Sequence, residues 1–128
     1  MSARPAKTVD FEECACSGRT LGKLVRPYIL ALLTHGPAHG YALLEQLAET
    51  GLAPDHSVVY RALLGMKREG LVTSKRARAS GGPARWEYEL TADGRACLQR
   101  WQQSLRVYRQ AIDRLLKLPS ATTRRCRC

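Results

Sequence analysis

The chain has 128 residues, 45% of them hydrophobic, and a formal net charge of +10. This length fits one domain with appendages, and the charge favours an anionic partner, nucleic acid first and an anionic membrane surface second. No apolar run approaches the roughly 18 residues of a membrane span. With no apolar segment near the start either, we expect no signal peptide, no membrane partner and a cytoplasmic location.

Residues 1–20 are predicted to form a polar tail that carries cysteines. A first helix is predicted over residues 21–34, because apolar side chains recur there at helical spacing. Pro27 lies inside this pattern. It either kinks the helix or marks the first turn of a shorter one.

Two further helices follow, over residues 41–50 and 55–69. Between the first and second helices lies a turn rich in Gly, Pro and His, in which we expect the histidines to cap or pack. Gly51 is expected to end the second helix, and Asp55 to cap the third. The third helix has a buried stripe at spacings of four and three residues, formed by Val59, Leu63 and Met66.

Two strands are predicted next, over residues 71–78 and 85–90, joined by a Gly-rich loop at 80–83. The second strand alternates apolar and polar residues strictly, with Trp86, Tyr88 and Leu90 on one face. Three helices followed by a hairpin predict a winged helix-turn-helix over residues 21–90. The expected fold class is therefore mainly α with a small β-hairpin.

A long helix is predicted over residues 91–118, capped by Thr91 and followed by a basic tail at 119–128. Its apolar residues repeat at heptad spacing. They are Leu98, Trp101, Leu105, Tyr108, Ile112 and Leu115. One helix cannot bury this stripe alone, so we interpret it as a homodimer seam. The alternative is that the helix packs back on its own domain.

The third helix has the properties of a helix that enters the DNA major groove. The side chains expected to meet DNA are His56, Ser57, Val58, Tyr60 and Arg61. Arg61 can donate to guanine or phosphate, and Val58 can contact a thymine methyl. The ordinary alternatives are a packing role for Tyr60 and a solvated charge for Arg61.

Four cations surround the predicted loop between the strands: Lys75, Arg76, Arg78 and Arg85. Placed beside the third helix, they would reach adjacent phosphates or the minor groove. The partner predicted by these features together is double-stranded DNA.

Three motifs resemble the PadR family of bacterial transcription regulators: the run His39-Gly40-Tyr41, the run Tyr60-Arg61-x-Leu63, and Tyr88-x-Leu90-Thr91-x-x-Gly94. The resemblance covers about residues 27–94, and the single long final helix is similar to the short members of that family. It implies a homodimeric repressor of a palindromic operator, usually released by a small-molecule effector. In some short members a flat ligand lies against a central tryptophan. Trp101, with Tyr108, is the candidate here, although Trp101 can equally be an interface core residue.

Two Cys-x-Cys pairs lie outside that family pattern, at Cys14 with Cys16 and at Cys126 with Cys128. Four thiolates would suit zinc, iron or an iron–sulfur cluster. A redox disulfide and incidental thiols are the alternatives. Cys97 is expected to be a small core residue.

No catalytic motif is present: the chain has no Gly-rich phosphate loop, no nucleophile elbow and no His-Glu-x-x-His. We therefore predict that it is not an enzyme. Three hypotheses remain: a DNA-binding regulator controlled at its cysteines, one controlled by a flat apolar ligand at Trp101, and an interaction adaptor that does not bind DNA.

Overall fold

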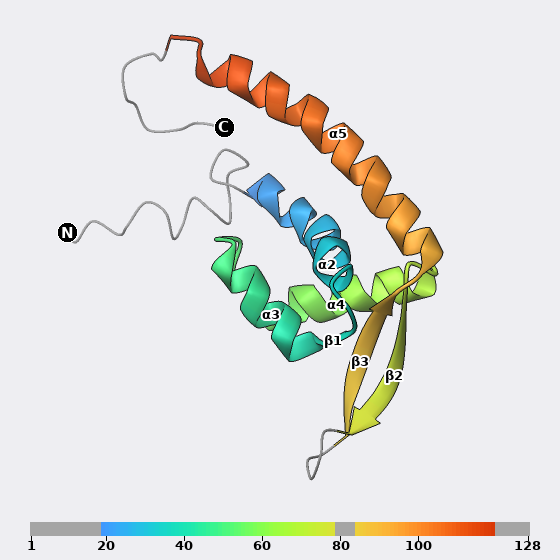
Figure 1. The fold of residues 1–128 in the computed structure, drawn as a ribbon. Helices are drawn as coiled ribbons and strands as arrows, with labels where there is room; N and C mark the ends of the chain where they lie inside the picture. Colours follow the sequence, from blue (N-terminus) through green and yellow to red (C-terminus); the bar gives the residue numbers. More distant parts are fainter. Residues whose placement is uncertain (1–18, 79–83, 120–128) are drawn as a thin grey trace, which may run out of the picture.

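The computed structural model describes residues 19–78 and 84–119 (Figure 1). In chain order its elements are a 3₁₀ helix, η2 (Arg19–Leu24), then α2 (Val25–Leu33), β1 (Ala38–His39), α3 (Gly40–Glu49), α4 (His56–Arg68), β2 (Val72–Arg78), β3 (Ala84–Leu90) and α5 (Ala92–Leu116). The predicted fold class, mainly α with a small sheet and a long final helix, is confirmed.

The first helix is straight and short. Pro27 lies in the first turn of α2, where backbone N–H groups have no partner within the helix, so its ring removes no hydrogen bond. Of the two interpretations of Pro27, the structure therefore supports the first-turn one. The residues before α2, Arg19–Leu24, form a 3₁₀ helix instead of more α-helix.

The sheet has one more strand than the sequence predicts. β1 pairs antiparallel with β3, placing Ala38 opposite Tyr88, so the order is β1-β3-β2. β1 spans two residues within a turn rich in helix breakers, which leaves no alternating pattern to detect. It attaches the start of α3 directly to the hairpin.

The core lies where α2, α3 and α4 meet the base of the hairpin. Its fully buried residues include Ile29, Leu30, Leu43, Leu47, Val59, Leu63, Met66 and Val72. Leu98, from the second turn of α5, completes this core at 7% exposure. α5 continues along α2 as far as Leu105 and then projects beyond the domain, on the side opposite the hairpin tip (Figure 1).

A bidentate ion pair joins α2 to the end of α4. Arg26 on α2 donates from Nη1 and Nη2 to the two carboxylate oxygens of Glu69, each at 3.0 Å, just beyond α4. These hydrogen bonds and the guanidinium charge lower the pKa of Glu69. The guanidinium crosses directly over Gly65, where a β-carbon would displace it.

The junction of hairpin and final helix is built on Thr91 and Gly94. The Thr91 hydroxyl accepts a hydrogen bond from the Gly94 N–H at 2.9 Å, so Thr91 caps α5 as predicted. The same hydroxyl donates to the carbonyl oxygen of Gly70 at 2.7 Å. Asp55, by contrast, occupies the cap position of α4 without a side-chain hydrogen bond. Within the described ranges, no helix combines the length and apolar character needed to cross a bilayer.

Candidate nucleic-acid interface

One face of the N-terminal half of α4 is exposed to solvent. Val59, Leu63 and Met66 are fully buried and hold one face of the helix on the core. Ser57 and Arg61 lie on the opposite face and are exposed, and Val58 and Tyr60 flank that face and are half-buried. His56 lies on the same side as the buried stripe, two turns before Leu63, and is exposed because it is the first residue of the helix. Four of the five predicted DNA contacts therefore lie on or beside the free face of α4, and His56 is exposed at its start.

Tyr60 is held by a close approach to α3. Its ring lies over Gly40, and a β-carbon at Gly40 would overlap the hydroxyl and come within 2.7 Å of the ring carbon Cζ. The His56 ring packs on the other side, with ring centroids 4.5 Å apart. This packing fixes the Tyr60 ring at the junction of the two helices, with part of its surface still open. Its ordinary packing role and its predicted DNA contact are thus compatible.

Arg61 makes no ion pair with a carboxylate among the described residues. Its Nε donates to the carbonyl oxygen of Ser57 at 3.4 Å, one turn back along α4. A long, exposed hydrogen bond from a guanidinium to a neutral carbonyl is readily exchanged for one to a charged acceptor such as phosphate.

The hairpin cations do not all face α4. Arg76 stands opposite Trp86 in the strand register, and its Cζ lies 5.7 Å from the centre of the Trp86 ring. Lys75 instead points to the other side of the strand pair, where its Nζ is 3.9 Å from a carboxylate oxygen of Glu87. The side chain of Arg78 lies outside the described residues.

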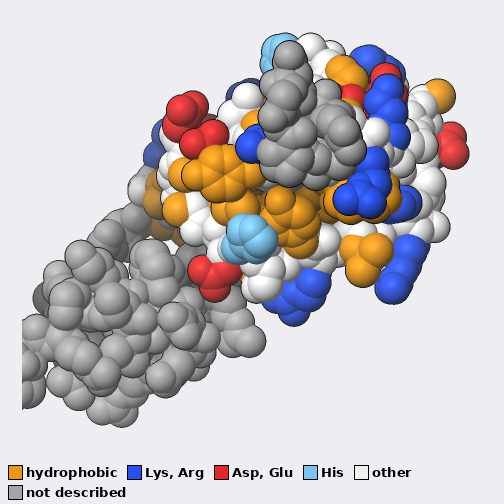
Figure 2. Space-filling model, turned by 90° about the horizontal axis from the view of Figure 1, so that it is seen from below, with side chains coloured by type: hydrophobic (Ala, Val, Ile, Leu, Met, Phe, Trp, Pro, Cys, Tyr) orange, Lys and Arg blue, Asp and Glu red, His pale blue; other side chains and the backbone are white. Residues whose placement is uncertain are grey.

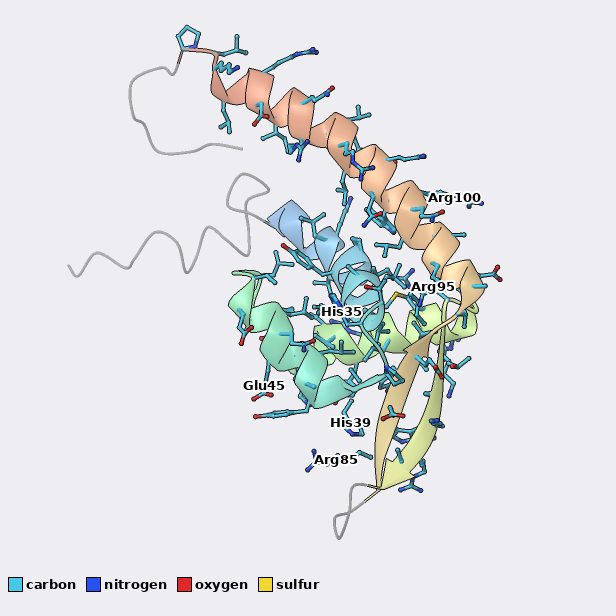
Figure 3. All side chains as sticks on the ribbon, viewed as in Figure 1. His35, His39, Glu45, Arg85, Arg95 and Arg100 are labelled. Carbon is cyan, nitrogen blue, oxygen red and sulfur yellow. The ribbon has the colours of Figure 1, made fainter. Side chains whose placement is uncertain are left out.

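Arg85 extends from β3 toward the start of α3. Figure 3 shows Arg85 and His39 on the same side of the hairpin, below the α3 N-terminus. Together with Tyr60 and Trp86, these two residues line an open hollow of about 480 Å³. Arg85 thus shares a hollow with Trp86 on the α3 side, whereas Arg76 contacts the Trp86 ring from β2.

Lys67 and Trp86, which the sequence did not single out as binding residues, also lie beside this face of α4. Lys67 lies two turns after Tyr60 on the same face of α4, and its Nζ is 5.3 Å from the centre of the Trp86 ring. Helical spacing from Tyr60 could have identified it. Trp86 was assigned to the apolar face of its strand, yet it is 49% exposed because the hairpin extends beyond the helical core.

A second hollow, of about 290 Å³, lies between α4 and the hairpin. Tyr60, Leu64, Lys67, Ser74, Trp86 and Tyr88 line it. Burial, and the nearby Tyr60, raise the pKa of Tyr88, so its phenol is neutral at physiological pH. Figure 2, which views the molecule from below, shows a band of hydrophobic side chains with Lys and Arg side chains along it.

The predicted seam on α5 changes character along its length. Leu98 is in the core of its own domain, and Trp101 and Leu105 are half-buried. Farther along, Tyr108, Ile112 and Leu115 are 59%, 52% and 64% exposed. The start of this helix packs on its own domain, as the second interpretation predicts, and its end leaves an apolar stripe without cover from the described residues. The homodimer seam stays a prediction.

Several hollows flank this seam, and two of them bear on the predictions. One of about 350 Å³ lies between α2 and α5 and is lined mainly by apolar side chains, among them Pro27, Tyr28, Leu98 and Leu105. The other, of about 270 Å³, places both candidate ligand residues together. It is lined by Cys97, Arg100, Trp101, Ser104 and Tyr108.

The four cysteines proposed as metal ligands, Cys14, Cys16, Cys126 and Cys128, lie outside the described residues. Cys97, which is inside them, is half-buried beside the core, in keeping with a small packing residue. Across residues 19–78 and 84–119, no three His, Cys, Asp or Glu side chains are placed to hold a metal ion.

Known proteins share this architecture. The model of the transcriptional regulator PadR-like family matches residues 29–100. A transcriptional regulator from Thermoplasma acidophilum is 35% identical, with a TM-score of 0.71 over 80% of this chain and 99% of that one.

Two further solved structures are 25% identical. One is a PadR-like regulator from Bacillus cereus, with a TM-score of 0.71 over 79% of this chain and 99% of that one. The other is a PadR family regulator from Clostridium difficile, with a TM-score of 0.67 over 73% and 98%. No curated protein matches the chain.

Proposed function

Because the chain belongs to the PadR-like family of transcriptional regulators, we propose that it is a homodimeric repressor that binds a palindromic operator. The family membership confirms that the chain is a DNA-binding type of regulator and not an enzyme. The observation that carries the proposal is the exposed face of α4, which includes Lys67, together with Arg76 and Arg85 on the neighbouring hairpin. A helix with exposed His, Ser and Arg at its start suits the major groove, and the hairpin suits the neighbouring backbone.

Dimerisation is supported by the exposed end of α5. Tyr108, Ile112 and Leu115 form a stripe that water would otherwise cover, and a second copy of the same helix offers a matching stripe. A twofold axis there would present two α4 helices to one duplex. Palindromic half-sites about one helical turn apart, roughly 34–36 Å, would then match the symmetry of the protein.

Arg61→Ala tests the major-groove assignment in a gel shift on DNA from upstream of the protein's own gene. We expect about a tenfold loss of affinity or more, given roughly 1–3 kcal/mol for a direct arginine contact. Arg95→Ala is the matched control, since this arginine lies on α5, away from the hairpin tip (Figure 3). Equal affinities of the two variants would count against the assignment. A wild-type protein that shifts no duplex at any salt concentration would favour the adaptor hypothesis.

A flat apolar effector at the α5 seam is the second candidate. It is supported by the hollow that brings Trp101 and Tyr108 together with Arg100. A ligand that spans this hollow and the partner's equivalent would change the packing of the two α5 helices, and with it the separation of the two α4 helices. Saturable quenching of tryptophan emission by planar aromatic compounds that is kept in Trp86→Phe and lost in Trp101→Phe would support this candidate.

Control through Cys14, Cys16, Cys126 and Cys128 remains a prediction that rests on the spacing of these residues. Two thiolate pairs are the donor set that zinc, iron or an iron–sulfur cluster prefers, and flanking arginines favour thiolates. Anaerobic purification followed by metal analysis should find close to one metal ion or cluster per thiolate set. Replacing Cys126 and Cys128 by serine should remove it. A metal-free protein whose DNA affinity ignores thiol oxidants would contradict both the metal and the redox versions.

A further inference from the structure

The exposed face of Trp86 is the feature that the proposed function leaves unexplained. An indole that is 49% exposed leaves much of its apolar surface in water, which is unfavourable unless something covers it. Trp86 is not part of the hydrophobic core, because the fully buried side chains reach only as far as the base of the hairpin. Two hollows adjoin it, and both also contain Tyr60 from α4. Trp86 and Tyr60 thus form an aromatic floor between α4 and the hairpin.

Cations stand on both sides of this floor. Lys67 approaches the Trp86 ring from α4 at 5.3 Å, and Arg76 approaches it from β2 at 5.7 Å. Both charges are exposed, and neither makes an ion pair with a described carboxylate. A cation–π contact at the surface is weak, roughly 0.5–1 kcal/mol, so each cation can turn to an anion while its stem stays on the ring.

The backbone of Trp86 is also fixed. Its carbonyl oxygen lies 3.3 Å from the Nδ1 of His39, and β3 is hydrogen-bonded on both edges, by β1 and β2. The indole is therefore presented from a supported central strand. An apolar surface flanked by cations on a supported scaffold matches a ligand that alternates apolar and anionic groups.

We propose that Trp86 and Tyr60 form a contact surface for deoxyribose, on which the sugar–phosphate strand between the two grooves of the operator is seated. This inference rests on the proposed DNA-binding function. When a helix occupies the major groove and a hairpin reaches the adjacent minor groove, the strand that separates the grooves passes between them. Its sugars would lie on the aromatic floor, and Lys67 and Arg76 would contact the phosphates on either side.

The salt dependence of binding separates this contact from a purely electrostatic one. Each phosphate contact releases counterions and adds about 0.9 to the slope of log affinity against log salt, whereas an apolar contact with sugar adds nothing. We therefore expect Trp86→Ala to weaken operator binding about tenfold at every salt concentration, comparable to loss of one aromatic stack. The slope should stay that of the wild type. Trp86→Phe should keep most of the affinity.

Lys67→Ala provides the contrast, with an expected fall in the slope of about 1. If Trp86 served only to position Lys67 and Arg76, Trp86→Ala would reduce the slope as well, and the inference would be wrong. Unchanged affinity in Trp86→Ala would also overturn it. Thermal unfolding of each variant checks the fold, and the Phe variant keeps the test decisive if the Ala variant unfolds. A wild-type protein that binds no duplex would instead overturn the proposed function, and this inference with it.

Discussion

Gly94→Ala is expected to lower the free energy of unfolding by about 1–3 kcal/mol, the range for forcing atoms into a packed site. A β-carbon at Gly94 would overlap the backbone carbonyl oxygen of Leu71 and come within 2.6 Å of the Leu90 side chain. A backbone carbonyl cannot turn aside as a side chain can. This one also accepts the Thr91 N–H at 3.1 Å, so any shift costs a second contact.

Helix propensity would predict the opposite sign for this substitution. Alanine is favoured over glycine inside a helix by about 1 kcal/mol, so a stabilised Gly94→Ala protein would mean that the junction relaxes freely. Urea unfolding followed by circular dichroism measures the difference. Gly22→Ala is the matched control, because nothing lies within 4 Å of its β-carbon position. We expect that variant to stay within about 0.5 kcal/mol of the wild type.

The second large effect is expected from Ile112→Asp. Ile112 is 52% exposed in the single chain, so the domain should fold normally with a carboxylate there. At a dimer seam the same carboxylate would be buried without a partner, which costs several kcal/mol. We expect a monomer at micromolar concentration and an operator affinity lower by at least about a hundredfold, since the advantage of two linked half-sites is lost.

Gln103→Asp is the control for Ile112→Asp, since it places the same charge on the face of α5 opposite the seam. Sedimentation velocity gives the oligomeric state, and a gel shift gives the affinity. A dimeric Ile112→Asp protein would show that the seam is not the interface. A monomeric wild-type protein with full operator affinity would contradict the homodimeric repressor itself.

Much of the fold could be predicted because its elements are periodic over many residues. The stripe of Val59, Leu63 and Met66 identified the buried face of α4, and hence the face that is free. β1 could not be predicted, because two residues carry no period. The exposure of Trp86 could not be predicted for a different reason. Alternation shows which face of the strand a side chain lies on, but it does not show whether another element covers that face at that position.

The heptad pattern on α5 was predicted correctly as a stripe, but its partner was not determined by spacing. Leu98 enters the core of its own domain because the start of α5 lies against α2, whereas the last three members, Tyr108, Ile112 and Leu115, have no such neighbour among the described residues. Gly94 appeared in the sequence as part of a family motif. Its physical reason, the close carbonyl of Leu71, is visible only once β2 and α5 are placed together.

The division of α5 into an anchored start and a projecting end has a mechanical consequence. From Leu98 to Leu116 the helix rises about 27 Å, at 1.5 Å per residue. The fixed end of the helix lies in the hydrophobic core, a few residues from the Thr91 junction with the hairpin, so a tilt about that end would move the free tip. Tilting such an arm by about 5° displaces its tip by roughly 2 Å, a shift typical of helices at allosteric interfaces. Small adjustments between two paired arms would thus be converted into changes of angle at the DNA-facing end of each domain.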